Sequence, residues 1–160
     1  MQNTQKISKA EALKKIEHYC AYQERCHKEV NEKLKSFGLF KSDRDELIVT
    51  LIDSGYLNEE RFVRAFIRGK FNQKNWGKLK IRNELKIKGI HDNLIERLLS
   101  EIDEKEYHEK LKKLLIKKSK EIKGGTVYSK KHKLFSYLYS KGYESNVIGE
   151  LLEAILMKKD

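Results

Sequence analysis

One pattern occurs three times along the sequence and constrains the fold more than any other feature. In each copy two apolar residues lie four positions apart, a glycine follows four positions later, and an apolar residue comes directly after it. The three glycines are Gly38, Gly89 and Gly142, so the copies are spaced about 52 residues apart. A glycine can adopt the left-handed conformation that ends a helix, and the apolar residue after it packs back onto the last turn. The pattern therefore predicts three copies of a helix, a tight turn and a second helix.

Each copy is preceded by another stretch with helical apolar spacing, which brings the prediction to nine helices. The chain contains no proline, the residue that most often interrupts a helix. The apolar positions of the three copies are Val30, Leu34, Leu39, Leu47, Ile48 and Leu51; Ile81, Leu85, Ile90, Leu98, Leu99 and Ile102; and Leu134, Leu138, Tyr143, Leu151, Leu152 and Ile155. The preceding stretches contribute Ala12, Leu13, Ile16 and Tyr19; Phe62, Ala65 and Phe66; and Leu111, Leu114 and Leu115. The helices are expected near residues 8–22, 26–37, 43–54, 58–72, 76–88, 91–103, 105–121, 129–141 and 144–158.

These helices predict an all-α fold of three tandem three-helix repeats, over residues 8–54, 55–103 and 104–158. A unit of about 50 residues buries little apolar surface alone and gains stability from its neighbours, so an elongated, curved stack is expected. Ser8 with Glu11 is typical of a capping box, and Asp92 and Ser129 are further candidates for helix starts.

Positive charge is concentrated in two parts of the chain. The 160 residues include 35 Lys and Arg against 24 Asp and Glu, a formal net charge of +11. Residues 61–90 hold ten basic residues and one acidic residue, and residues 105–133 hold eleven and three, whereas residues 1–60 hold ten and eleven. Such an excess favours a polyanionic partner, either a nucleic acid or an acidic protein surface.

A run of lysine and arginine on a helix has two readings, a solvated face or a binding surface. A solvated face usually carries Glu or Asp three or four positions away. Those partners are mostly missing in the second repeat, where Lys78, Arg82 and Lys86 form a stripe one helical turn apart. Trp76, the only tryptophan, stands where the stripe begins and serves either packing between helices or contact with the partner. The predicted binding residues are Arg64, Arg68, Lys70, Lys74, Trp76, Lys78, Lys80, Arg82, Lys86, Lys88, Lys130, Lys131 and Lys133.

Catalytic and metal-binding patterns are not found in the sequence. His18, Cys20, Cys26 and His27 form the only cluster that resembles a metal site, but their spacing matches no common zinc pattern. The glycines form neither a phosphate-binding nor a dinucleotide-binding loop. We therefore expect no enzymatic activity, no metal and no cofactor. The two cysteines do not suggest a disulfide framework, and no apolar run is long enough to span a membrane, so a cytoplasmic location is expected.

Two segments resemble the RecX family of bacterial regulatory proteins: Gly55-Tyr56-Leu57-Asn58-Glu59-Glu60-Arg61-Phe62-Val63, and the segment from Trp76-Gly77-Lys78 to Lys88-Gly89-Ile90. The resemblance implies three tandem three-helix repeats and a cytoplasmic, non-enzymatic modulator of the RecA recombinase, active in DNA repair, recombination and the SOS response. Such proteins lie in the groove of the RecA filament on DNA and inhibit filament extension, ATPase, strand exchange and coprotease activity. One departure is Cys26, because many relatives carry a serine there as a helix cap and a thiol is a poorer hydrogen-bond acceptor.

Two functions are carried forward from the sequence. The first is inhibition of RecA by a monomer that binds the RecA filament on DNA. The alternative is direct, largely sequence-independent binding of single- or double-stranded DNA by a helix-turn-helix type protein. Base-specific reading has little support, because the expected helix over 91–103 offers only Asn93 and Arg97 for it. A third, weaker idea is self-assembly through apolar helix faces.

Overall fold

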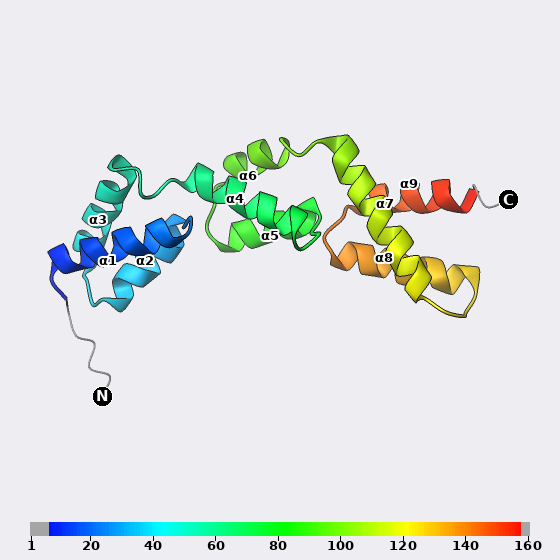
Figure 1. Cartoon of the computed structure of the whole chain (residues 1–160), viewed down its shortest axis with the longest axis horizontal. Coiled ribbons are helices and arrows are strands. Elements are labelled where there is room, and N and C mark those ends of the chain that lie inside the picture. The colour runs from blue at the N-terminus through cyan, green and yellow to red at the C-terminus, as the bar shows by residue number, and fades with distance from the viewer. Residues whose placement is uncertain (1–6, 158–160) are drawn as a thin grey trace, which may run out of the picture. The chain divides into compact units, whose positions relative to one another are not determined.

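The computed structural model describes residues 7–157, and within that range the chain forms nine helices and no strands (Figure 1). The predicted all-α class is confirmed. The helices are α1 (Lys9–Tyr22), α2 (His27–Ser36), α3 (Lys41–Asp53), α4 (Glu59–Asn72), α5 (Lys78–Ile87), α6 (Asp92–Leu99), α7 (Glu104–Glu121), α8 (Val127–Ser140) and α9 (Ser145–Met157). The predicted end of the last helix, Lys158, lies outside the described residues.

Local hydrogen bonds test where three of these helices were expected to begin. The Ser8 hydroxyl accepts a hydrogen bond from the backbone N–H of Glu11 at 3.2 Å, which confirms Ser8 as the cap of α1. The helix α6 begins at Asp92 as expected, with the His91 ring accepting from the N–H of Asn93. Ser129 is not a helix start, because α8 already begins at Val127.

The three repeated glycines end their helices in the predicted way. Gly38, Gly89 and Gly142 have φ angles of 81°, 78° and 99°, the left-handed region that a side chain disfavours. The residue after each one, Leu39, Ile90 or Tyr143, is buried. The turn geometry expected from the repeated pattern is therefore confirmed.

The chain divides into two compact units. The first comprises the described residues up to Phe66 together with Leu85–Leu94, and the second comprises Ile67–Glu84 together with the described residues from Ile95 onward. The division passes through α4, α5 and α6, whereas the three-repeat division of the sequence remains a prediction.

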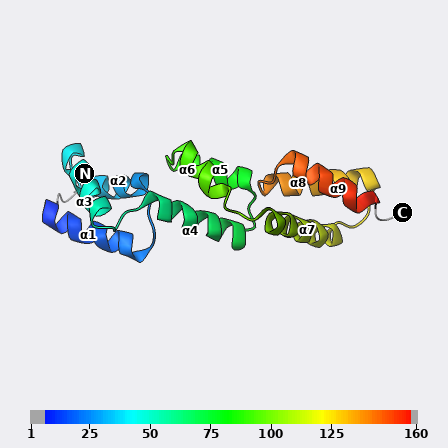
Figure 2. The same ribbon diagram turned by 90° about the horizontal axis from the view of Figure 1, so that it is seen from above.

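In the first unit, α1, α2 and α3 pack against one another (Figure 1; Figure 2). Their core contains the apolar positions that the periodicity singled out, with Leu13, Tyr19 and Ile48 partly buried at its edge. The fully buried members include Ala12, Ile16, Val30, Leu34 and Leu51.

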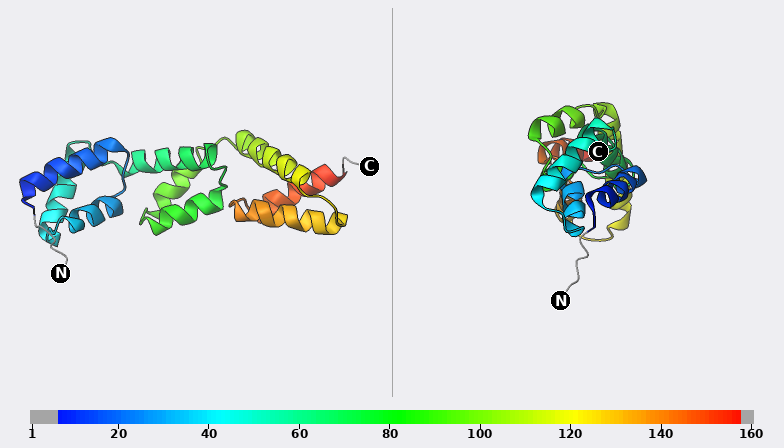
Figure 3. Two further views of the ribbon diagram at one scale, coloured as in Figure 1. Left: turned by 60° about the horizontal axis from the view of Figure 1, so that its bottom comes forward. Right: turned by 90° about the vertical axis from the view of Figure 1, so that its left-hand side faces the viewer.

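In the second unit, α8 packs against both α7 and α9 (Figure 3). Leu111, Leu115, Leu134 and Leu138 are buried here, as is Tyr143 in the turn before α9. These positions were predicted from spacing alone.

One predicted core position is wrong. Ala65 on α4 is exposed, and Phe66 is only half-buried. The buried residues of this helix are Phe62, Val63, Ile67 and Phe71. The four basic residues of α4 sit between these apolar positions and obscure the true apolar stripe in the sequence.

Candidate functional site

Trp76 forms the centre of a cluster of basic side chains in the second unit. Its backbone N–H donates to the carbonyl of Lys70 at 3.0 Å, so the chain turns back on the end of α4. The indole is half-buried, and the ammonium groups of Lys70 and Lys80 lie 4.9 and 4.6 Å from its centre. An aromatic face attracts a cation without cancelling its charge. We call Lys70, Trp76 and Lys80 the tryptophan cluster.

Two nearby lysines are also held without a carboxylate. The Lys78 ammonium lies 4.8 Å from the centre of the Tyr107 ring. The Lys110 ammonium donates to the carbonyl of Phe71 at 2.7 Å and to the Asn75 side chain at 3.3 Å, and burial lowers the pKa of this lysine. The ammonium groups of Lys78, Lys80 and Lys110 are therefore held in place by aromatic rings and neutral oxygens, which leaves their charge available to an external anion.

The turn that carries Trp76 is joined to the turn before α9 by backbone hydrogen bonds. The N–H groups of Gly77 and Leu79 donate to the carbonyls of Lys141 and Gly142, each at 2.8 Å. A Cβ atom on Gly77 would lie 2.4 Å from the carbonyl oxygen of Gly142, and one on Gly142 would lie 2.3 Å from the Cβ of Lys80. Only glycine at both positions allows this approach, so the tryptophan cluster is anchored to the third predicted repeat. The anchoring role of Gly77 was not predicted.

Tyr107 fixes the start of α5 beside this joint. Its hydroxyl accepts from the backbone N–H of Lys78 at 3.0 Å and donates to the Glu144 carboxylate. The Tyr143 hydroxyl donates to the carbonyl of Asn75 at 3.1 Å. Burial raises the pKa of both tyrosines well above the ordinary value, so both rings are neutral hydrogen-bonding groups. Nothing in the sequence pattern links these residues, because the partners lie 29 to 68 positions apart.

The expectation that the basic residues of the second repeat lack acidic partners is wrong for four of the predicted binding residues. Arg82 donates to Glu96 through Nε at 2.5 Å and Nη2 at 3.1 Å, and Arg64 pairs with Glu60 at 3.0 Å. Lys86 and Lys88 lie 3.9 and 3.7 Å from Asp92 and Glu29. Three of these acids come from other helices, which sequence spacing along one helix could not reveal.

The thirteen predicted residues do not all lie in one unit. Arg64, Lys86 and Lys88 belong to the first unit, and the other ten belong to the second. Arg68 and Lys74 are exposed and form no ion pair within residues 7–155. On α8, Lys130 and Lys131 border an apolar cavity of about 650 Å³ and Lys133 is exposed. The tryptophan cluster with Arg68, Lys74 and Lys78 is therefore the candidate interaction surface.

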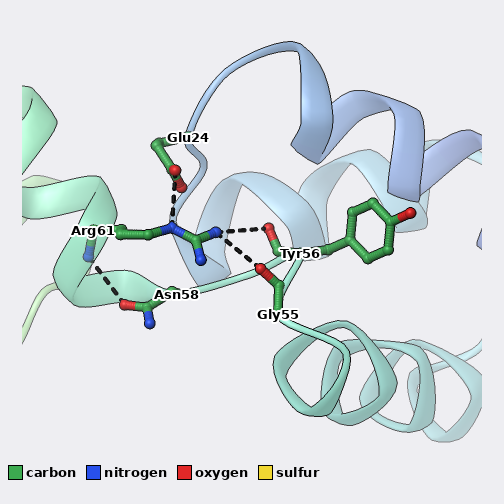
Figure 4. Close-up of polar contacts among 5 residues, drawn as sticks. All are labelled: Glu24, Gly55, Tyr56, Asn58 and Arg61. Atoms are coloured by element: carbon green, nitrogen blue, oxygen red, sulfur yellow. Dashed lines mark hydrogen bonds and ion pairs between the residues drawn. The ribbon is translucent and has the colours of Figure 1, made fainter.

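Arg61 holds together the first of the two segments that resemble the RecX family, residues 55–63 (Figure 4). The Arg61 guanidinium donates to Glu24 at 2.9 Å and to the carbonyls of Gly55 and Tyr56 at 3.0 and 3.5 Å. Its backbone N–H donates to the Asn58 side chain at 3.0 Å, which caps α4. Arg61 thus ties the start of α4 to the loop before α2 within the first unit.

Cys26 is the capping residue before α2, and two glutamates support the start of this helix. Its N–H donates to the Glu29 carboxylate at 3.1 Å, and the N–H of His27 donates to Glu59 at 3.0 Å. The weaker cap that a thiol offers is therefore compensated by carboxylates. Burial raises the pKa of Cys26 to about 11, and both cysteines are free thiols.

Two further observations bear on the class of site. Among residues 7–155, no group of three or more His, Cys, Asp or Glu side chains is arranged to hold a metal ion. No helix in the described part of the chain has the length and apolar character needed to cross a bilayer.

The nine helices of residues 7–157, with their left-handed glycine turns and basic surface, define an all-helical protein. Models of the second and third three-helix domains of RecX match residues 58–99 and 104–152. The chain belongs to the RecX family, a family of regulatory proteins and not of enzymes.

Relatives and solved structures agree with this assignment. The regulatory protein RecX of Halalkalibacterium halodurans is 32% identical over 89% of this chain, and that of Prosthecochloris aestuarii is 29% identical over 91%. This chain spans 54% of the first relative and 93% of the second. The crystal structure of RecX from Lactobacillus salivarius is 26% identical with a TM-score of 0.85, and covers 93% of this chain and 97% of its own. A second RecX crystal structure, 22% identical with a TM-score of 0.82, covers 91% of this chain and 71% of its own and shows the same fold.

Proposed function

We propose that the protein is a negative regulator of the RecA recombinase. It binds in the groove of the RecA filament on DNA and inhibits filament extension, ATPase, strand exchange and coprotease activity. Family membership supports a regulatory role, and the candidate interaction surface supports binding to a negatively charged assembly.

The observation that carries the proposal is the way Lys78 and Lys80 are held. An ammonium group paired with a carboxylate gains little from an external anion, whereas one resting on an aromatic ring keeps its full charge. Lys78 and Lys80 rest on rings, and Arg68 and Lys74 project from the same unit without a described ion pair. A polyanionic groove supplies the missing negative charge. The protein needs no catalytic group or cofactor for this role, because it acts by occupying the filament.

The test is titration of the purified protein into RecA ATPase and strand-exchange assays at two salt concentrations. A triple variant Arg68→Ala, Lys74→Ala, Lys80→Ala is compared with the matched variant Lys14→Ala, Lys35→Ala, Lys41→Ala. Both variants lose three positive charges, but the second loses exposed lysines from the first unit. We expect the first variant to need about tenfold more protein for half-inhibition, and the second to act like the wild type. Absence of inhibition by the wild type at either salt concentration would overturn the proposal.

A second candidate, direct binding of DNA with little sequence preference, is favoured by the two basic blocks at residues 61–90 and 105–133. If DNA binding is the primary activity, affinity falls steeply with salt, with a log–log slope of about −0.9 per phosphate neutralised on duplex DNA. If filament binding is primary, inhibition occurs at substoichiometric amounts even where binding to DNA alone is undetectable. The two outcomes separate the candidates.

A further inference from the structure

The first unit contains a surface of basic and aromatic side chains, although residues 1–60 hold ten basic and eleven acidic residues. The helices α1 and α2, with the loop between them, border a cavity of about 430 Å³. Tyr19, Tyr22 and Phe37 provide its aromatic rings. We call this cavity the α1–α2 pocket.

Basic side chains surround these rings. The Arg25 guanidinium lies 3.7 Å from the centre of the Tyr19 ring, and its Nε donates to the Tyr19 carbonyl at 3.1 Å. The Lys33 ammonium lies 5.5 Å from the centre of Tyr19 and 5.7 Å from that of Phe37, and the Lys15 ammonium lies 5.8 Å from the centre of Phe37. Arg25, Lys15 and Lys33 form no ion pair within residues 7–155. Three cations therefore line one cavity, which His18 also borders.

Residues 1–60 are almost neutral overall, but three acidic residues of α1, α2 and the loop between them are engaged away from this pocket. Glu17 interacts with the Tyr56 hydroxyl. Glu24 pairs with Arg61, and Glu29 caps Cys26 and lies 3.7 Å from Lys88. No acidic side chain lines the α1–α2 pocket.

Tyr22 is the feature that indicates a ligand. It is the last residue of α1, 80% of it is exposed, and it forms no hydrogen bond or ring contact with any described residue. An exposed ring beside a basic cavity provides a stacking platform, the arrangement by which proteins bind unpaired bases while cations hold the phosphates.

We propose that the α1–α2 pocket binds single-stranded nucleic acid, with an unpaired base stacked on Tyr22 and the adjoining phosphates held by Lys15, Arg25 and Lys33. A duplex is a poor ligand because its bases are already stacked on each other and cannot cover the ring. An acidic peptide satisfies the three cations but leaves Tyr22 unused. This site lies outside the candidate interaction surface and goes beyond the proposed regulation of RecA.

The test measures binding of a fluorescent oligothymidine of about 15 nucleotides by anisotropy, with the 160-residue protein and its variants. We expect Tyr22→Ala to weaken binding by about 5- to 150-fold, the effect of losing one base–aromatic stack. Tyr22→Phe keeps the ring and binds like the wild type. Phe40→Ala, which removes another exposed ring of the same unit that does not border the pocket, also binds like the wild type. Lys33→Ala lowers the slope of log affinity against log salt by about 0.7.

A second readout locates the contact even if other surfaces also bind DNA. An oligonucleotide that carries 5-iododeoxyuridine is crosslinked by light, and the modified peptide is identified by mass spectrometry. Crosslinking within the peptide that contains Tyr19 and Tyr22 supports the proposal. The proposal is overturned if Tyr22→Ala binds the oligonucleotide as tightly as the wild type and no crosslink forms in that peptide. It is also overturned if Tyr22→Ala weakens binding to single-stranded and duplex DNA equally. Displacement of the oligonucleotide by polyglutamate from both wild type and Tyr22→Ala, with equal affinity, assigns the pocket to acidic peptides and overturns it as well. The regulatory role is tested separately, by the RecA assays with the triple variant Arg68→Ala, Lys74→Ala, Lys80→Ala. Those three residues lie in the second unit, whereas Tyr22 lies in the first, so the two proposals can fail independently.

Discussion

Gly77 and Gly142 allow the turn before α5 and the turn before α9 to form backbone hydrogen bonds with each other. Their backbones approach so closely that a methyl group on either one would lie within 2.4 Å of its neighbours. A Cβ atom on Gly69 of α4 or Gly149 of α9 would have no neighbouring atom within 4 Å, so glycine is not required there for space. The same residue type therefore has opposite consequences at different positions.

We predict that Gly77→Ala lowers the free energy of unfolding by about 1–3 kcal/mol, because backbone atoms must shift to admit the methyl group. Gly69→Ala is the matched control and is expected to stabilise the protein by roughly 0.5–1 kcal/mol, since alanine favours a helix interior. Urea unfolding followed by circular dichroism measures both. Equal stability of the two variants would contradict the close approach of the two turns.

Tyr107 and Tyr143 predict a specific sensitivity to alkali. Burial raises the pKa of both hydroxyls above the ordinary value of 10.0, so the folded protein keeps protons that the unfolded chain loses. Their contribution to stability is complete below pH 10 and declines as the pH rises above it. We expect the melting temperature of the wild type to fall more steeply between about pH 9 and pH 11 than that of the double variant Tyr107→Phe, Tyr143→Phe.

The double variant also loses hydrogen bonds to Lys78, Glu144 and Asn75, so its stability is lower at every pH. The slope with pH is therefore the quantity to compare, and Tyr128→Phe, an exposed tyrosine, is the control. Parallel pH curves for wild type and double variant would refute the prediction.

At the scale of the element, α8 begins at a different residue from the one predicted. The sequence suggests Ser129 as the helix start, whereas the helix begins at Val127. Thr126 is the capping residue, and its hydroxyl accepts from the N–H of Ser129 at 3.0 Å. Ser129 instead donates to the carbonyl of Thr126 at 3.0 Å from inside the first turn.

We predict that Thr126→Ala destabilises the protein by about 1 kcal/mol, the usual effect of losing a helix cap. Ser129→Ala removes no cap and is expected to change stability by less than about 0.5 kcal/mol. Thermal unfolding of the two single variants makes the comparison, and a larger loss for Ser129→Ala would reverse the assignment.

The helices and most of their buried residues could be predicted because periodicity and glycine turns act within a single element. Leu34, Leu85 and Leu138 are buried as their spacing requires. The cap of α8 was missed because threonine and serine three positions apart are equally good acceptors in sequence, and only the backbone chooses between them.

The candidate site could be predicted only in part. The concentration of basic residues around Trp76 is visible in the sequence. The sequence does not show which of these residues pair with a carboxylate and which lie on an aromatic ring. Arg82 meets Glu96 fourteen positions away, whereas Lys80 meets the Trp76 ring. Such contacts depend on how helices pack, which spacing along one helix does not encode. The α1–α2 pocket was missed for the same reason. Residues 1–60 hold almost equal numbers of basic and acidic residues, and the sequence does not show that no acidic side chain lines the pocket.

At the scale of the whole molecule, we predict a monomer. Exposed aromatic and aliphatic side chains such as Tyr22, Phe40 and Val127 come from different elements, as is usual for monomeric proteins. The net charge of +11 also opposes association of identical chains. Light scattering after gel filtration is expected to give 18.9 kDa at every loading concentration. A mass that rises with concentration would instead support self-assembly through helix faces.

The contact between two ammonium groups and the single indole gives the molecule a reporter of its own. Trp76 is the only tryptophan, so all indole emission originates beside Lys70 and Lys80. An anion that attracts these lysines changes the electric field across the ring and with it the colour and brightness of the emitted light. Occupancy of this surface can therefore be followed optically in the unlabelled protein, in real time and without altering a residue.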